Sequence, residues 1–177
     1  MVAPTRVFPS LEYLNSVLEF KDGVLYNKIT RNSRAVKGTL AGAISGKYRL
    51  ITLHGKSFLL HRIAYYMAHG TCPDYLDHIN GNRFDNRVDN LRPATIAENS
   101  RNQPLLSTNK SGVKGLSWSK QANKWYACIR YNGVNKNLGH FESKELGAEF
   151  LELARDMLHG SFANHGKFKE NISCQLS

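Results

Sequence analysis

Residues 77–87 read Asp-His-Ile-Asn-Gly-Asn-Arg-Phe-Asp-Asn-Arg, and Asn90 and Asn99 follow at short distances. The Asp-His pair ends a short apolar strand, and the Asn-, Gly- and Asp-rich run after it predicts a loop. An imidazole accepts a proton near neutral pH, while carboxylate and amide oxygens bind hard divalent cations. The stretch therefore predicts a general base beside one divalent cation, a combination that suits cleavage of a phosphodiester.

The elements around this stretch predict a ββα unit. We expect a strand over 75–77, a loop over 80–86 and a second strand around 91–92. Thr95 and Glu98 form a capping box, which places Asn99 in the first turn of a helix. Upstream, the pattern predicts a helix capped by Ser10, a strand over 24–26, a hairpin formed by strands 48–53 and 57–60, and a helix over 61–68. The expected fold class is α+β.

The charge of the chain favours a polyanionic partner. The sequence has 24 Lys and Arg against 14 Asp and Glu, a formal net charge of +10. Residues 23–73 and 101–141 contain no acidic residue, and these stretches lie on either side of the Asp-His motif. Such a distribution favours a surface that follows nucleic-acid phosphates. A membrane surface fits less well, because no basic amphipathic helix and no bilayer-length apolar run is present.

The cysteines and the N-terminal residues indicate a reducing compartment. Cys72, Cys128 and Cys174 are far apart and show no CxxC spacing. This spacing predicts neither a disulfide framework nor a zinc site. The stretch from Met1 to Pro9 lacks the apolar core of a signal peptide. We therefore expect a cytoplasmic protein.

Four short motifs in the first half carry a family resemblance. They are Leu60–Ala64, Asp77–Asn82, Asp85–Arg87 and Asn90–Arg92. Residues from about 20 to 103 resemble the HNH homing and nicking endonucleases of phages, members of the ββα-metal nuclease superfamily. The resemblance implies a phage-encoded enzyme that acts in a host cell.

The resemblance also implies a role for each residue of the motif. His78, Asn90 and Asn99 match the three signature positions, an H-N-N variant that active family members also use. His78 would be the general base, Asp77 and Asn99 would bind Mg²⁺ or Mn²⁺, and Asn90 would hold the loop behind His78.

Three further residues of the first half keep two interpretations each. Asn86 and Arg87 would stabilise the loop or contact a phosphate. His61 would pack against the metal unit or contact substrate.

The second half resembles another family. Ser111–Lys114, Lys124–Arg130 and Asn137–Phe141, followed by a helix, are similar to an AP2 DNA-binding domain over residues 111–165. The resemblance implies a three-stranded antiparallel sheet packed on one helix, with the sheet lying in the major groove of DNA.

Alternation along the central strand assigns the two faces of that sheet. Trp125, Ala127, Ile129 and Tyr131 would pack on a helical stripe. This stripe consists of Leu146, Phe150, Leu153 and Met157. The open face would carry Arg130 together with Lys114, Trp118, Asn135 and Asn137 from the flanking strands, and these are candidate DNA-binding residues. Lys120 and, in the first half, Arg87 are further candidates.

These observations predict an HNH nuclease domain over 1–103, a linker over 104–110, an AP2-like domain over 111–165 and a tail over 166–177. The expected protein is a monomeric, site-preferring, homing-type DNA endonuclease that nicks double-stranded DNA, since one site per chain carries one base. One alternative is a non-catalytic DNA-binding regulator that retains the nuclease fold. Another is an RNA-directed nuclease or binder, because the metal site does not contact the sugar.

Overall fold

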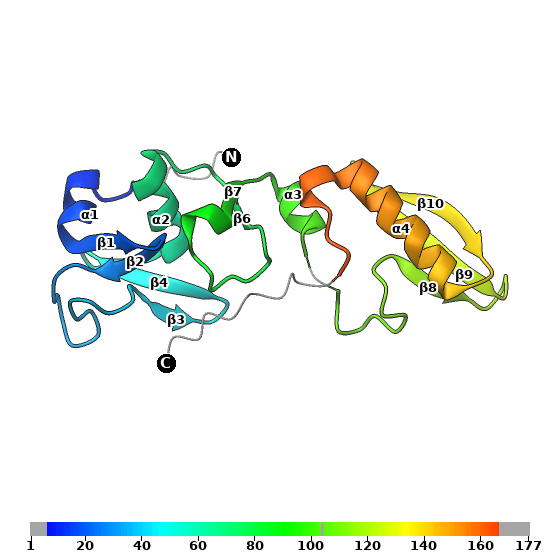
Figure 1. Ribbon diagram of the computed structural model, residues 1–177, viewed down its shortest axis with the longest axis horizontal. Helices are drawn as coiled ribbons and strands as arrows, with labels where there is room; N and C mark the ends of the chain where they lie inside the picture. The colour runs from blue at the N-terminus through cyan, green and yellow to red at the C-terminus, as the bar shows by residue number, and fades with distance from the viewer. Residues whose placement is uncertain (1–6, 104, 167–177) are drawn as a thin grey trace. The chain divides into compact units, whose positions relative to one another are not determined.

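The computed structural model describes residues 7–103 and 105–166, and the chain divides into two compact units (Figure 1). The first unit runs to His78 and includes Asn82–Pro93. The second holds Ile79–Gly81 and the chain from Ala94 onward. Most of the expected tail, from residue 167, lies outside the described residues. Helices and several small sheets make this a mixed α/β protein, in agreement with the coarse fold class.

Within the described residues, the first unit combines two α-helices with three small antiparallel sheets. The sheet pairings are β1 with β2, β3 with β4 and β5, and β6 with β7. The elements are α1 Leu11–Val17, β1 Leu18–Lys21, β2 Val24–Asn27, β3 Ala43–Ser45, β4 Tyr48–Leu53, β5 Lys56–Leu59, α2 Leu60–His69, β6 Leu76–His78, the 3₁₀ turn η1 Val88–Asn90 and β7 Leu91–Pro93.

Local signals account for most of these boundaries. Ser10 caps α1, because its Oγ accepts a hydrogen bond from the Tyr13 amide at 3.2 Å. The turn between β4 and β5 uses His54 and Gly55, both with positive φ. Gly70 ends α2 in the left-handed conformation, which glycine adopts without steric cost. The predicted helix, hairpin and second helix are confirmed, whereas β1 and β3 were not predicted.

The core of the first unit positions the Asp-His motif. Leu14, Leu25, Ile51 and Ile63 are buried together, and Leu91 of β7 joins the same cluster. The β6–β7 ribbon is therefore anchored to this core through one of its own strands. His78 lies opposite Leu91 in this ribbon, so the core also fixes the position of the His78 backbone.

The second unit consists of a three-stranded antiparallel sheet, a long helix and a short helix (Figure 1). The strand order is β10-β9-β8, and α4 packs against all three strands. The elements are α3 Ile96–Arg101, β8 Leu116–Ser119, β9 Lys124–Tyr131, β10 Val134–Phe141, α4 Lys144–His159 and the 3₁₀ turn η2 Gly160–Phe162. No helix in the described part of the chain is long and apolar enough to cross a bilayer.

The face of α4 that packs on the sheet differs from the predicted one. Its buried residues are Gly147, Leu151 and Arg155. A Cβ atom on Gly147 would lie 2.9 Å from Leu116 Cδ1, so the absence of a side chain lets the helix approach β8 closely. The predicted stripe, Leu146, Phe150, Leu153 and Met157, is instead exposed. That prediction was wrong because the packed face contains a glycine and an arginine, which an apolar pattern does not reveal.

The sheet faces agree with the alternation except at Trp118. Ala127 and Ile129 form a core with Leu116 and Leu151, as expected for the packed face. Trp118 lies directly opposite Trp125 in the β8–β9 register, with the ring centroids 5.4 Å apart. Residues paired in this way point to the same face of a sheet. Trp118 is therefore on the face of Trp125, and its predicted place on the open face is wrong.

Candidate active site

β6 and β7 place the Asp-His pair in a buried ribbon of the first unit. All three residues of β6 are buried. In the antiparallel register Asp77 lies opposite Arg92, and His78 lies opposite Leu91. Successive side chains of a strand leave opposite faces, so the carboxylate and the imidazole have different surroundings.

The His78 ring is held by Asn86. Its Nε2 atom lies 3.1 Å from Oδ1 of Asn86, and both groups are buried. An amide oxygen only accepts hydrogen bonds, so Nε2–H donates and the lone pair of the neutral ring is at Nδ1. Burial lowers the pKa of His78, against smaller opposing effects from Asn86 and Asp77. The ring is thus neutral at neutral pH and able to accept a proton.

The loop between β6 and β7 is tied by its own side chains. Asn90 Nδ2 donates to the Asp85 carbonyl at 2.8 Å. Arg87 bonds the Asp85 carboxylate through Nε at 2.9 Å and Nη2 at 3.0 Å. These contacts bracket Asn86 and fix it toward His78. The structure contains the loop contact expected of Asn90, and the geometry of Arg87 favours loop stabilisation over a phosphate contact.

Asp77 forms an ion pair with Arg92 across the ribbon. Its Oδ2 accepts from Arg92 Nε at 2.9 Å and from Nη2 at 2.7 Å. The Asp77 carboxylate is buried and the guanidinium is largely so. The carboxylate predicted to bind a metal ion therefore already neutralises a neighbouring cation.

The available donors fit a hard, oxygen-binding ion better than zinc. Residues 7–103 and 105–166 contain no group of three or more His, Cys, Asp or Glu side chains that could hold a metal ion. Zinc sites in proteins need such a group. Mg²⁺ instead binds through one or two carboxylates and fills its other positions with water and substrate phosphate. Asp77 is compatible with that type of site.

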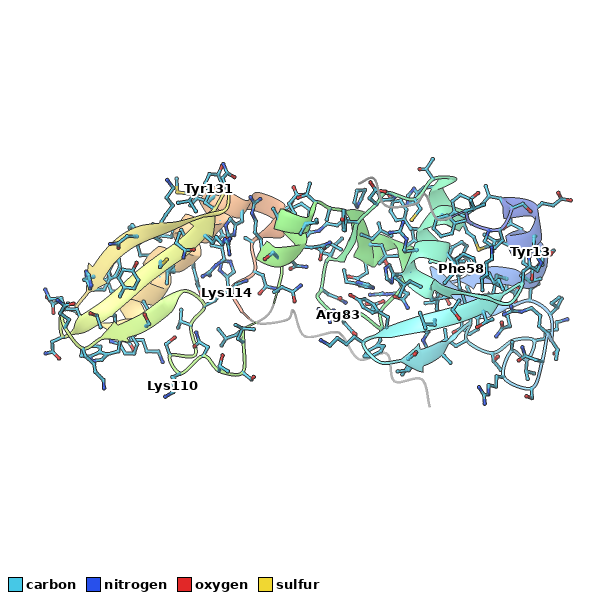
Figure 2. All side chains as sticks on the ribbon, turned by 180° about the vertical axis from the view of Figure 1, so that it is seen from behind. Tyr13, Phe58, Arg83, Lys110, Lys114 and Tyr131 are labelled. Atoms are coloured by element: carbon cyan, nitrogen blue, oxygen red, sulfur yellow. The ribbon has the colours of Figure 1, made fainter. Side chains whose placement is uncertain are left out.

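His61 packs beside the candidate base. Its ring centroid lies 5.0 Å from that of His78 in an edge-on arrangement, and 5.6 Å from that of Tyr48. Arg83, labelled in Figure 2, lies over the Tyr48 ring at 5.5 Å. Burial, with smaller effects of His78 and Arg62, lowers the pKa of His61 to about 3. This burial favours the packing interpretation of His61.

Asn99 belongs to the second unit. It lies in α3, which begins with the predicted capping box: Thr95 Oγ1 accepts from the Glu98 amide at 3.2 Å, and Glu98 Oε2 accepts from the Thr95 amide at 2.7 Å. The helix start is confirmed. The role of Asn99 as a metal ligand stays a prediction.

Comparison with known proteins identifies the family of the site. Residues 58–101 match a family model described as HNH endonuclease. Protein 3.8 of Escherichia phage T7 is 40% identical over 98 residues, which cover 54% of this chain and 80% of that protein. Residues 58–101 therefore carry an HNH endonuclease domain.

A second similar protein is also viral. An uncharacterized HNH endonuclease of Acanthamoeba polyphaga mimivirus is 34% identical over 111 residues, 61% of this chain and 57% of that protein. No solved structure matches the chain. HNH nucleases generally use a divalent metal ion and act on DNA, so the family indicates a metal-dependent nuclease with a DNA substrate.

Most candidate DNA-binding residues in the second unit of this HNH protein are exposed. Arg130 lies opposite Asn135, and Cys128 lies opposite Asn137, which places all four on the open face. Lys120 is exposed in the turn after β8. Their contact with DNA stays a prediction, as does the AP2 identity of the sheet.

Lys114 is the exception among these candidates. Its Nζ donates to the carbonyl oxygens of Arg101 at 2.8 Å and Gln103 at 2.7 Å, at the end of α3. Burial and the charge of Arg155 lower the pKa of Lys114 to about 8. The ammonium therefore has an internal role in the second unit, where the sequence predicted an external one.

Two residues of the HNH site acquire roles that the sequence did not assign. Asn86 was expected to stabilise the loop or to contact a phosphate, but its side chain is hydrogen bonded to His78 and orients that ring. Arg92 lies within a family motif, yet its pairing with Asp77 follows only from the register of β6 and β7. The sequence offered one signal for this pairing: Asp77 and Arg92 have opposite charges and stand at equal distances from the loop that connects the two strands, as cross-strand partners do.

Proposed function

We propose that this protein is a metal-dependent DNA endonuclease that nicks one strand, with His78 as the general base. The observation that carries the proposal is the buried imidazole whose Nε2–H is committed to Asn86. A base needs an accessible lone pair, a fixed orientation and a neutral ring at working pH. The Asn86 contact supports the fixed orientation and places the lone pair on Nδ1, and the lowered pKa supports the neutral ring.

The chain divides the chemistry among four residues. Nδ1 of His78 takes a proton from the attacking water, while Asn86 holds the ring and Asn90 holds the loop that carries Asn86. Asp77 is the residue of the first unit that would hold a hard divalent ion. The ion would supply positive charge near the scissile phosphate and the leaving oxygen. Mg²⁺ or Mn²⁺ suits these oxygen donors.

One base per chain supports nicking by a monomer. Hydrolysis of one strand uses one activated water, and a double-strand break would need a second copy or a second visit. The second unit would target the enzyme through an AP2-like sheet, as in a homing-type endonuclease. Support for this comes from the exposed Arg130, Asn135 and Asn137 and from the net charge of +10.

One contact favours the alternative, a DNA-binding regulator that retains the nuclease fold. Arg92 occupies Oδ2 of Asp77, the oxygen that a metal ion would share. In a non-catalytic protein the same ion pair would serve only to hold the β6–β7 ribbon together.

Nicking of supercoiled plasmid distinguishes the two functions. The full chain, incubated with Mg²⁺ or Mn²⁺, should convert supercoiled DNA to the open circular form, and EDTA should stop the reaction. His78→Ala should slow nicking by a factor on the order of 10² or more and leave DNA binding unchanged. His69→Ala, an exposed histidine of the same unit, is the control. Binding without nicking by the parent protein would establish the regulator instead.

A further inference from the structure

A pocket of about 400 Å³ lies within the second unit and has a positively charged lining. Its polar wall includes Lys114, Arg130, Arg155, His159, Asn109 and Asn135, and no Asp or Glu lines it. Figure 2 shows Lys114 and Tyr131 at the same end of the sheet, where β9 extends beyond β8. A volume of this size accommodates a small ligand with one charged group.

The two strongest cations of this pocket, Lys114 and Arg155, donate hydrogen bonds to neutral groups, which carry no compensating negative charge. Arg155 is buried, with Nη2 donating to the Lys114 carbonyl at 2.6 Å and Nη1 lying 3.2 Å from His165 Nδ1. The Lys114 ammonium carries three N–H groups and donates to two carbonyls. Buried charges are costly unless an opposite charge is near. Glu152 and Asp156 act on Arg155 from outside the pocket, and an anion inside it would bring a negative charge to Lys114 and His159 as well.

The pKa values report the same imbalance. Burial lowers the pKa of Lys114, of Arg155 and of His159. The cationic neighbours add to this for Lys114 and His159, since Arg155 acts on both. Glu152 and Asp156 act on Arg155 in the opposite direction, but neither lines the pocket. The lining groups thus repel one another in the unliganded protein.

One wall atom also lacks a partner. His159 Nε2 lies 3.2 Å from the Arg130 carbonyl, to which it must donate. Its Nδ1 is buried and has no hydrogen-bond partner within the described residues. A protonated His159 would donate through Nδ1 as well, and a bound anion would favour that form.

We propose that this pocket binds a phosphate group, with Lys114, Arg155 and His159 as its donors. The phosphate belongs either to a free nucleotide or to the backbone of a duplex. The duplex source rests on the DNA-directed function proposed above, whereas binding of a phosphate as such does not. The pocket would give the second unit a phosphate contact made by side chains that are already held in place, unlike the exposed side chains on the open face of its sheet.

The test is a titration of the full ¹⁵N-labelled chain, without metal, at constant ionic strength. Inorganic phosphate, thymidine 5′-monophosphate and a short duplex are added separately, and NMR shifts of Gly115, Ile129 and the Arg155 Nε–H are followed. The proposal expects saturable shifts confined to the pocket with phosphate or with the nucleotide. Displacement of the nucleotide by the duplex would identify the DNA backbone as the source, and its retention would identify a free nucleotide.

Two variants provide the contrast. Lys114→Met should weaken phosphate binding at least tenfold, while Lys110→Met, at the exposed lysine labelled in Figure 2, should change it less than twofold. If Lys114→Met does not fold, the wild-type titration decides alone. Shifts that do not saturate, or that spread over the basic surface, would overturn the proposal, as would equal binding by the two variants. The His78→Ala protein should bind phosphate normally, so failed nicking and an empty pocket are separate results.

Discussion

The His78 site and the open face of the β10-β9-β8 sheet both carry polar side chains, but those of the site are buried and hydrogen bonded, whereas those of the sheet face are exposed. Asp77, His78, Asn86 and Asn90 are all buried, and each is hydrogen bonded to another residue of the ribbon or its loop. Arg130, Asn135 and Asn137 are exposed on the sheet. Chemistry needs groups fixed within fractions of an ångström, whereas a DNA-reading surface gains its order on binding. The difference predicts where substitutions abolish activity and where they only weaken binding.

The largest expected effect is at the buried carboxylate. Asp77→Ala should remove metal-dependent nicking, because loss of a metal ligand costs several kcal/mol of transition-state stabilisation, more than 10²-fold in rate. Asn99→Ala should raise the Mg²⁺ concentration needed for half-maximal rate. Asp89→Ala, at an exposed acid of the same loop, is the control. Identical metal titrations for the parent and both site variants would exclude Asp77 and Asn99 as ligands.

The next prediction concerns packing in the second unit. Leu151 is fully buried and Leu153 is 59% exposed. Leu151→Ala should lower the free energy of unfolding by about 2–5 kcal/mol, and Leu153→Ala by about 0.5 kcal/mol or less. Chemical denaturation followed by circular dichroism measures both. An equal loss of unfolding free energy in the two variants, or a larger loss for Leu153→Ala, would show that α4 packs on the sheet through the stripe predicted from the sequence.

That stripe shows where sequence reasoning fails for this fold. Caps and turns are local, so Ser10, the Thr95–Glu98 box and the β4–β5 hairpin could be predicted from neighbouring residues. The rotation of α4 about its axis is decided by the sheet. Gly147 allows the closest approach to Leu116, and four large apolar residues are left outside.

In the candidate site, too, features set by neighbouring residues could be predicted, whereas features set by tertiary structure could not. The motif spacing was enough to select His78, Asn90 and Asp77, because each lies at a set distance along the chain. The partners of these residues depend on how the loop and the ribbon close. Asn86 reaches His78 only when the loop folds back, and Arg92 meets Asp77 only in one register of β6 and β7.

Asn86 offers a test of that closure. Asn86→Leu removes the acceptor for Nε2–H, so the ring loses its fixed tautomer and orientation. Nicking should fall about 10- to 100-fold, as for other residues that orient a catalytic histidine. The loss should appear in kcat with KM nearly unchanged, and Asn86→Asp, which keeps an acceptor, should recover much of it. A change in KM alone would instead indicate a phosphate contact by Asn86.

A smaller effect is expected on the exposed face. Arg130→Ala should weaken binding to a preferred site by about 1–3 kcal/mol if Arg130 contacts a base, and should affect random DNA less. Lys120→Ala should weaken both equally and lower the salt slope of binding by about one. Fluorescence anisotropy at several salt concentrations separates the two. Unchanged affinity in both variants would mean that this face does not bind DNA.

The smallest effect reports on the buried ring beside His78. The folded-state pKa of His61 is about 3, below its ordinary value of 6.5, so the unfolded chain binds a proton more readily than the folded chain between these values. Stability should therefore fall as pH drops below 6.5, and His61 should contribute a slope of about 1 kcal/mol per pH unit. His61→Phe keeps a ring against His78 and Tyr48 but cannot take up the proton. Urea denaturation between pH 6.5 and 5 should give a shallower slope for this variant, with the exposed His69→Phe as the control. Parallel curves for the parent and His61→Phe would show that His61 is protonated in the folded protein, and would reopen its interpretation as a substrate contact.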